Sequence, residues 1–324
     1  MNTRETLDKL IGWARAPLAE WPSRYPEHQA AGYLCSYVPA EILHAAGWTP
    51  VRLRGTAAPL RQVDAHLQSF TCALCRSSFD QALGAELGFL AGTVFAHTCD
   101  TMQALADLWR MHLGAERFVA VVMQPSNLAT PAARPYLIAE LERFRQEMAA
   151  LVGAPLSDDD LLNSIALYDE TRRLVGELQE LRGRLNSPQF YALLDAAQKT
   201  PRELFNPLLQ DLVTELGDSP RRPGGPRLFL VGSVLDEPRL LDLIADLGAQ
   251  VSGDDLCSGS RYFAGQVGTA GAPIKALADY YLQRPLCPTK YRADHDPSRY
   301  LLDQVRRSGR RRLCDRKVLR TLCL

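Results

Sequence analysis

The chain has 324 residues, 46% of them hydrophobic, which is enough for two domains with buried cores. Its 37 basic residues balance its 37 acidic residues, and this neutrality argues against nucleic-acid binding and against an acidic solvated tail. Residues 1–5 lack the apolar start of a signal peptide and no apolar run reaches the ~20 residues of a membrane helix, so we expect a cytoplasmic protein whose cysteines need not form disulfides.

The first 134 residues show the pattern of an α/β domain. Residues 1–30 have an amphipathic helical pattern, and residues 32–39 indicate a turn or loop. A helix is expected over residues 39–46, because proline suits a first helical turn and Gly47 suits the end. Strands are expected at Val51–Leu53, Gly92–His97 and Phe118–Met123. Strands that alternate with helices predict a parallel sheet, so we assign residues 1–134 to an N-terminal α/β domain.

A long helical segment separates this domain from a second α/β unit. Residues 135–218 show helical periodicity, with charged residues on the faces opposite the leucines. Proline and glycine mark residues 219–226 as a linker. A strand, a helix, a strand and a loop are then expected over residues 227–231, 238–247, 250–252 and 253–261. The sequence therefore predicts an α/β fold with two Rossmann-like parallel-sheet domains, the second spanning residues 227–324.

Cys99 lies where an open α/β sheet binds its ligands. It follows the expected strand Gly92–His97, and parallel sheets hold ligands at the carboxyl ends of their strands. A second thiol group, Cys72 and Cys75, precedes it, and two such groups in an unsecreted chain favour a metal ion or a cluster. The Cys-x-x-Cys pair is also compatible with a redox pair or half of a zinc site. On its sequence alone, Cys99 is also compatible with a buried, unreactive thiol.

Four motifs in order resemble the subunits of 2-hydroxyacyl-CoA dehydratases and the related benzoyl-CoA reductases. The motifs are Gly32-Tyr33-Leu34-Cys35-Ser36-Tyr37-Val38-Pro39 with Glu41 and Ala45-Ala46-Gly47, Cys72 with Arg76-Ser77, His97-Thr98-Cys99-Asp100, and Asp254-Asp255-Leu256-Cys257 with Gly259 and Arg261. The resemblance runs in register from about residue 30 to about residue 308. Each motif alone is weakly specific, but their shared order identifies the family.

The resemblance implies a heterodimer of related subunits, each holding a [4Fe–4S] cluster through three cysteines. It implies that Cys72 and Cys99 are two of these ligands, because the family's cysteine falls four residues before Arg76, and Cys75 then stands where the family usually has an apolar residue. A separate ATP-hydrolysing iron–sulfur activator supplies one electron at low potential. Dehydratases form a ketyl radical from a (R)-2-hydroxyacyl-CoA and expel the hydroxyl group, whereas reductases pass electrons to an aromatic CoA thioester. Thiolates are soft ligands, and a cluster with three protein ligands leaves one iron open as a Lewis acid.

Three polar residues beside these motifs have a functional and a structural interpretation. Ser36 is the candidate catalytic residue, because it could contact the substrate or a cluster-bound oxygen, and the alternative is a turn serine that hydrogen-bonds nearby backbone. His97 could donate to the substrate or the cluster, but a structural role is favoured. Asp100 is expected to cap the helix that follows it.

The remaining motif residues are expected to be structural or to line the interdomain cleft. Asp254 and Asp255 are adjacent, so in an extended chain they point to opposite faces and form no paired-carboxylate site. Cys257 is expected to line the cleft without ligating the cluster. Cys35 and Cys287 are interpreted as structural.

Residues 310–324 do not fit the family pattern. They are rich in arginine and lack the apolar strand that should follow residues 301–305. Such an end is typical of a GC-rich gene read out of frame, and one choice of codons, shifted by one base, encodes an apolar strand followed by a cysteine. On this hypothesis residues 310–324 lie outside the sheet, and the third cluster ligand is absent because it falls where Leu319 and Arg320 now stand. The alternative is a genuine basic tail that binds an acidic partner.

The sequence therefore predicts an iron–sulfur subunit of a 2-hydroxyacyl-CoA dehydratase-type enzyme, with a truncated second domain and inactive as it stands. A benzoyl-CoA reductase-type subunit is the alternative within the family. A non-catalytic thiol- or metal-binding scaffold is the alternative outside it. The expected partners are a related second subunit, the activator and an acyl-CoA.

Overall fold

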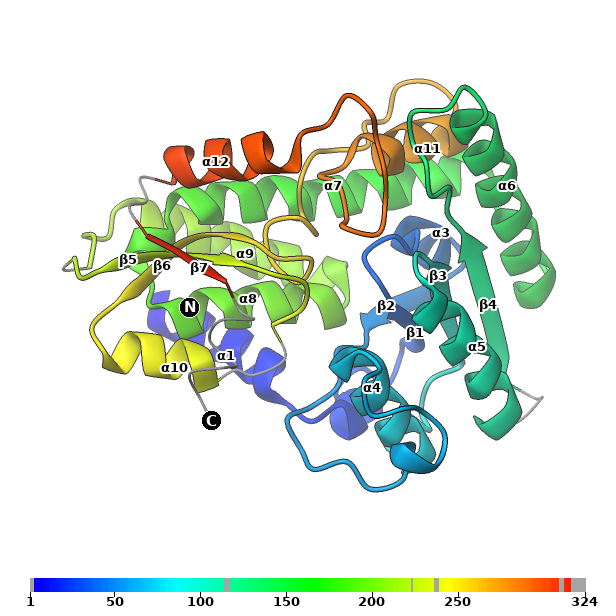
Figure 1. The fold of residues 1–324 in the computed structure, drawn as a ribbon, viewed down its shortest axis with the longest axis horizontal. Helices are drawn as coiled ribbons and strands as arrows, with labels where there is room; N and C mark the ends of the chain where they lie inside the picture. The colour runs from blue at the N-terminus through cyan, green and yellow to red at the C-terminus, as the bar shows by residue number, and fades with distance from the viewer. Residues whose placement is uncertain (1–2, 114–116, 223, 236–238, 309–311, 316–324) are drawn as a thin grey trace.

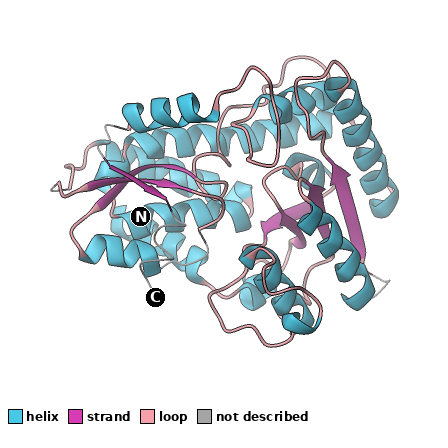
Figure 2. Ribbon diagram, viewed as in Figure 1, coloured by secondary structure: helices cyan, strands magenta, loops and turns pink. Residues whose placement is uncertain are grey.

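A four-stranded parallel sheet forms the core of one half of the protein (Figures 1 and 2). The computed structural model describes residues 3–113, 117–222, 224–235, 239–308 and 312–315. The strands lie in the order β2-β1-β3-β4, and their bounds are β1 (Gln29–Leu34), β2 (Trp48–Arg52), β3 (Gly92–His97) and β4 (Phe118–Met123). The α/β class with a parallel sheet is confirmed, and β3 and β4 have the predicted bounds.

β1 is the central strand of this sheet, so the expected turn or loop over residues 32–39 was wrong at its start. The strand pairs in parallel with β2 on one side and β3 on the other. Its first four residues include no β-branched side chain, and this weak strand propensity explains the failed prediction. Gly32 permits close packing, because a Cβ atom there would lie 2.6 Å from Leu90 Cδ1. Tertiary packing therefore places β1 where local propensity does not.

Helices cover both faces of the sheet (Figure 1). One face packs against α3, α6, α11 and the first half of α7, and the other packs against α2, α4 and α5. Side chains alternate accordingly, since Tyr33 and Val94 lie in the first core and Leu34 and Phe95 in the second. The bounds are α2 (Trp21–Arg24), α3 (Ala40–Ala45), α4 (Ala73–Leu83), α5 (Asp100–Leu113), α6 (Ala133–Val152), α7 (Asp158–Glu180) and α11 (Pro273–Gln283).

A smaller parallel sheet, in the order β6-β5-β7, lies in the other half (Figure 1). Its strands are β5 (Arg227–Val231), β6 (Gln250–Asp255) and β7 (Arg312–Asp315). β6 continues past the expected end at residue 252, which places the adjacent aspartates in a strand. The helices of this half are α1 (Thr3–Arg15), α8 (Ser187–Lys199), α9 (Arg202–Gly217), α10 (Arg239–Asp246) and α12 (Pro297–Arg307). Short 3-10 turns occupy Leu18–Glu20, Val63–Ala65 and Arg182–Arg184.

α7 joins the two halves of the molecule (Figure 1). Leu161 and Ile165 lie in the core beside the four-stranded sheet, whereas Leu174 and Leu178 lie in the core beside the smaller sheet. α1 packs on α8 and α9, and α11 packs on α6, so the two cores are built from interleaved parts of the chain. Within the described ranges, we find no helix with both the length and the apolarity for a membrane crossing.

The structure corrects the expectation that residues 310–324 lie outside the sheet. Arg312–Asp315 form β7, which pairs in parallel with β5 from Leu228 to Val231. An open strand edge presents unpaired N–H and C=O groups, and any extended segment can satisfy them with its backbone. Arg310, Arg311 and residues 316–324 lie outside the described residues. The out-of-frame hypothesis stays a prediction, which sequencing of the gene across these codons tests.

The N-terminus of α7 is fixed by a capping box, which gives a local prediction. The Ser157 hydroxyl accepts a hydrogen bond from the Asp160 N–H at 3.1 Å, and the Asp160 carboxylate accepts one from the Ser157 N–H at 2.8 Å. We expect Ser157→Ala to lower the free energy of unfolding by about 1 kcal/mol in urea titration. The control Ser23→Ala removes an exposed hydroxyl that caps no helix in this way and should cost less than about 0.5 kcal/mol. Equal unfolding midpoints for Ser157→Ala and wild type would contradict this.

Candidate functional site

The candidate site lies at the topological switch point of the four-stranded sheet. The chain leaves β1 toward β2 on one side, and β3 pairs with β1 on the other side. In such sheets, ligands bind at the carboxyl ends of the two strands where the order reverses. Cys35 follows the end of β1, and Thr98 and Cys99 follow the end of β3. The two loops are in contact, because Cys35 Sγ lies 3.4 Å from Thr98 Oγ1.

Cys99 is half-buried just before α5, within electrostatic reach of other thiols. Burial raises the pKa of the Cys99 thiol, and the neighbouring thiols of Cys35 and Cys72 raise it further. The backbone N–H groups of Met102 and Thr101, at the start of α5, act in the opposite direction. Cys72 and Cys99 therefore share one electrostatic environment, although the chain between them forms a whole helix and strand.

Cys72 and Cys75 differ in access. Cys72 is exposed and precedes α4, whereas Cys75 is 1% exposed in the first turn of that helix. A hydrogen bond with Cys72 raises the pKa of Cys75 most, and burial and the nearby thiols raise it further. The raised pKa keeps the Cys75 side chain in its neutral thiol form. Cys72, in contrast, is exposed to solvent. A neutral, buried thiol is a poor nucleophile and a poor metal ligand.

Cys35 was interpreted as structural, but the structure places it at the switch point. Its backbone is left-handed, with φ of 79°, which is uncommon for a residue other than glycine. Backbone outliers of this kind concentrate at ligand-binding and catalytic sites. Its position directly after β1 was the available signal, and it was missed because β1 itself was taken for a loop.

Ser36 is buried beside Cys35 and is held through its backbone. The carbonyl oxygen of Ser36 accepts a hydrogen bond from the guanidinium of Arg284, which is itself buried. The other Arg284 nitrogen donates to the carbonyl of Arg261 at 2.9 Å. His97 ends β3 half-buried, and α5 begins at Asp100. The loop after β1 is therefore tied to the loop after β6 by a buried cation.

Lys290 supplies a second buried cation at the site, and the sequence did not single it out. It is 6% exposed, and its Nζ donates to the Gln124 carbonyl at 3.3 Å. Burial lowers the pKa of Lys290, and the thiols of Cys35, Cys287 and Cys99 act against this. The Lys290 ammonium therefore acts on these thiols in the direction opposite to burial, which raises the pKa values of Cys35 and Cys99.

The loop after β6 closes the site on the side of the smaller sheet. Asp254 forms a buried ion pair with Arg182 at 2.5 Å, and Asp255 pairs with Arg261 at 2.8 Å. The two aspartates thus pair with different arginines. The Cys257 carbonyl accepts a hydrogen bond from Arg52, and the Cys257 thiol contributes to the raised pKa of Cys35.

The two candidate cysteines have the right chemistry for an iron–sulfur cluster, but the described residues offer no third ligand beside them. Cys72 is accessible and Cys99 half-buried, and both are soft ligands. Among the described residues, no three side chains of the types His, Cys, Asp and Glu are arranged to hold a metal ion. Within the described residues, the two predicted ligands therefore belong to no complete metal-binding group.

Comparison with known proteins decides the family. A family model described as "2-hydroxyglutaryl-CoA dehydratase, D-component" matches residues 35–310. The chain belongs to this dehydratase family. The match begins at Cys35 and includes Cys72, Cys99 and the loop after β6.

Individual members of the dehydratase family cover most of the chain. One of the benzoyl-CoA reductase subunits of Thauera aromatica is 30% identical over 89% of this chain and 77% of its own length. The beta subunit of lactoyl-CoA dehydratase from Anaerotignum propionicum is 24% identical over 86% of this chain and 76% of its own length. The beta subunit of (R)-phenyllactyl-CoA dehydratase from Clostridium sporogenes is 22% identical over 86% and 75%. The resemblance drawn from the four motifs is therefore confirmed.

Proposed function

We propose that this chain is an iron–sulfur subunit of a 2-hydroxyacyl-CoA dehydratase-type enzyme that performs single-electron chemistry on a CoA thioester. Cys72 and Cys99 are the proposed ligands of a [4Fe–4S] cluster, and Ser36 is the proposed contact to the substrate. The observation that carries the proposal is the meeting of the loops after β1 and β3 at the switch point, within the span that matches the family.

The protein residues prepare a site for an anionic group. Lys290 and Arg284 are buried there, and the Lys290 ammonium lies within electrostatic reach of Cys35 and Cys99, whose thiol pKa values are raised by burial. Cys75 forms a hydrogen bond with Cys72, and its raised pKa keeps it a neutral thiol. When bound, the cluster supplies an iron with an open coordination position and a one-electron couple. The described residues leave the third ligand unassigned, and the chain is proposed to be inactive as it stands.

The proposal includes partners and an architecture. The relatives are named as subunits, which supports a related second subunit as partner. An ATP-dependent iron–sulfur activator and an acyl-CoA complete the set of proposed partners. We also propose that the two parallel sheets with their helices are two Rossmann-like domains, and that the protein is cytoplasmic.

A benzoyl-CoA reductase-type subunit is the second candidate. The specific observation that favours it is the 30% identity with a benzoyl-CoA reductase subunit. The dehydratase-type and reductase-type proposals use the same thiol site. They differ in the acyl group of the CoA thioester that the two subunits bind together. A non-catalytic thiol- or metal-binding scaffold is the third.

Purification without oxygen tests the shared part of these proposals. After reconstitution with iron and sulfide, we expect a brown protein with a broad absorption at about 400 nm, because iron–thiolate charge transfer absorbs there. A colourless protein that takes up zinc in place of iron would contradict the proposal and favour the scaffold.

A further inference from the structure

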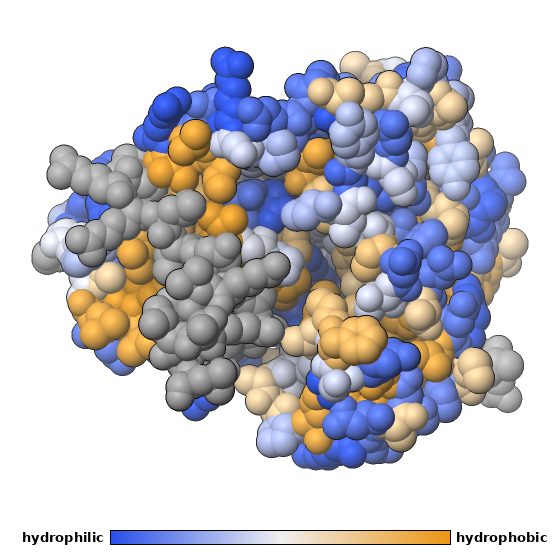
Figure 3. All heavy atoms as spheres, viewed as in Figure 1, coloured by the Kyte–Doolittle hydropathy of each residue, from blue (hydrophilic) through white to orange (hydrophobic). Residues whose placement is uncertain are grey.

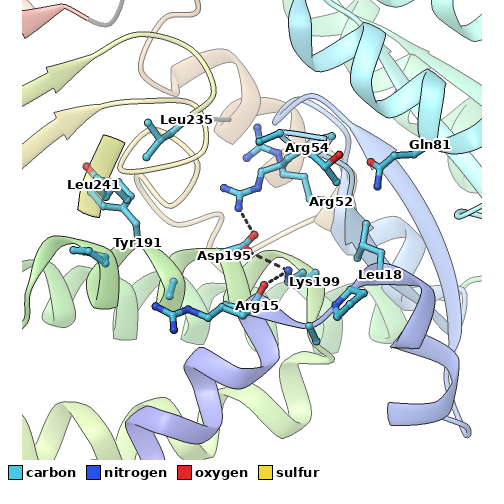
Figure 4. Close-up of a pocket in the computed structure, with 18 of the residues that line it drawn as sticks. Arg15, Leu18, Arg52, Arg54, Gln81, Tyr191, Asp195, Lys199, Leu235 and Leu241 are labelled. Carbon is cyan, nitrogen blue, oxygen red and sulfur yellow. Dashed lines mark hydrogen bonds and ion pairs between the residues drawn. The ribbon is translucent and has the colours of Figure 1, made fainter. Parts of the chain in front are cut away.

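A long loop carries Cys72 from the junction of the two halves to the start of α4. Residues 53–72 connect β2 to α4 and include the 3-10 turn Val63–Ala65. The start of the loop lines a cavity of about 640 Å³, where Arg54 forms an ion pair with Asp195 of α8 (Figure 4). Figure 3 shows a recess where the two halves meet, and α4 with this loop lies at the bottom of the same view (Figure 1). Long loops in compact domains are usually either functional or mobile, so the contacts that hold this loop decide how well Cys72 is placed.

Two side chains of α4 hold the first part of the loop. The Ser77 hydroxyl accepts a hydrogen bond from the Thr56 N–H at 2.8 Å and donates one to the Thr56 carbonyl at 2.9 Å. The Asp80 carboxylate accepts hydrogen bonds from three consecutive backbone N–H groups, those of Arg61, Gln62 and Val63. These contacts fix the loop at points that lie well before Cys72 in sequence.

Arg76, on the same helix, holds the last part of the loop. Its guanidinium forms an ion pair with Asp64 and donates a hydrogen bond to the Ser69 carbonyl at 3.1 Å. Its backbone N–H donates to the Cys72 carbonyl at 3.1 Å, which closes the first turn of α4. The Arg76 side chain is 16% exposed, so most of this bridge is shielded from water. One residue therefore joins two points of the loop to the helical turn that begins at Cys72.

This bridge gives a physical reason for the spacing of Cys72 and Arg76. Cys72 is exposed, but its thiol lies within electrostatic reach of Cys99 and hydrogen-bonds to Cys75. Two thiols bind one metal or cluster well only if they are already in place, because ordering a loop during binding costs free energy. The proposed function leaves unexplained what keeps an exposed thiol at the end of a long loop in place, and Arg76 supplies the contacts that do so.

We propose that Arg76 is the positioning residue of the thiol site: it fixes the last part of the loop and so holds Cys72 within reach of Cys99 before a metal or cluster binds. Arg76 acts through Cys72 and is assigned no contact with a reacting group. The choice of iron as the ligand rests on the proposed function, whereas the fixing of Cys72 does not. Partners that orient a metal ligand typically change metal affinity by 10–100-fold, which sets the size of the expected effect.

Hydrogen exchange of the metal-free, full chain tests whether Arg76 holds the loop. We expect the backbone amides of residues 64–72 to exchange about tenfold faster in Arg76→Gln than in wild type, because both anchors of this segment are lost. Ser77→Ala should instead accelerate exchange near Thr56 and leave residues 64–72 unchanged. Asp64→Asn breaks the same ion pair from its exposed side, so it carries the test if Arg76→Gln does not fold.

Retention of iron tests whether this contact matters for the site. After anaerobic reconstitution, we expect Arg76→Gln to lose iron to a chelator such as bathophenanthroline about tenfold faster than wild type. Arg76→Lys keeps a cation for Asp64 and should recover part of this loss, whereas Arg76→Met fills similar space without a charge and should recover none. The matched control is Arg110→Gln, because Arg110 also pairs with an aspartate, Asp107, and donates to a backbone carbonyl, but on α5. It should lose iron at the wild-type rate.

Each outcome decides the inference. Faster exchange at residues 64–72 together with faster loss of iron supports it. Exchange at the wild-type rate in both Arg76→Gln and Asp64→Asn would overturn it, and so would faster exchange with an unchanged loss of iron. Equal loss of iron in the lysine and methionine variants would show that the charge of Arg76 positions nothing. A wild type that binds no iron would defeat the proposed cluster, and the exchange experiment would then decide by itself whether Arg76 holds Cys72 in place.

Discussion

Cys99→Ser and Cys72→Ser are each expected to remove most of the iron that the chain retains after anaerobic reconstitution and gel filtration. Each variant removes one thiolate from a site that offers few, and a hydroxyl is a poor ligand for an iron–sulfur cluster. Both residues are accessible enough for a hydroxyl to be tolerated, since Cys72 is exposed and Cys99 half-buried. The measurement is iron per chain, with thermal unfolding as the check that each variant is folded.

Cys75→Ser is the matched control, because it changes a thiol of the same pair. Cys75 is buried, and its pKa is raised by its hydrogen bond with Cys72 and by burial, so it is not expected to act as a ligand. We expect this variant to keep most of its iron. Equal loss of iron in the Cys75 and Cys72 variants would show that the ligand was assigned to the wrong cysteine.

The second large effect is expected from Asp254→Ala, which should lower the free energy of unfolding by about 3–5 kcal/mol. The Asp254 carboxylate accepts hydrogen bonds from Arg182 at 2.5 Å and from the Tyr191 hydroxyl at 2.9 Å, and the aspartate is 4% exposed. Removing it leaves the buried Arg182 guanidinium without its counter-charge. Urea unfolding measures the loss. Asp107→Ala, which breaks an exposed pair with Arg110, is the control and should cost less than about 1 kcal/mol.

The same aspartate gives a pH dependence. Burial opposes the charged form of Asp254, but Arg182 and the Ser260 N–H outweigh it and hold the pKa of this carboxyl below its usual value. Its contribution to stability is therefore complete above the unfolded-state pKa of about 3.9 and is lost as the pH falls through the lower folded-state value. We expect the difference in stability between wild type and Asp254→Ala to be constant from pH 7 to about 5 and to shrink below about 4. A difference that grows on acidification would contradict the ion pair.

The sequence located the end of β3 correctly, because strand ends are local signals. β3 has strong strand formers, Thr93-Val94-Phe95, so its end and the cysteine after it could be located. Motif order located the loop after β6, and the alternation of a strand is in line with the different arginine partners of Asp254 and Asp255.

The residues that sequence reasoning missed depend on contacts between distant segments. β1 is placed by packing rather than propensity, so the switch point and the role of Cys35 could not be derived. Lys290 lies far from Cys35 and Cys99 in sequence, and only the fold brings its ammonium to these two thiols. The pairing of β7 with β5 was missed because it is made by backbone groups at an open strand edge, which the side-chain composition of residues 310–324 does not reveal.

The most direct test of the account is the content of iron and acid-labile sulfide in the unmodified chain after anaerobic reconstitution. A cluster at the switch point predicts that both are present in equal amounts, and that both are lost together in the Cys72→Ser/Cys99→Ser double variant. Iron without sulfide would contradict a cluster held by these cysteines. So would a double variant that retains as much iron and sulfide as the wild type.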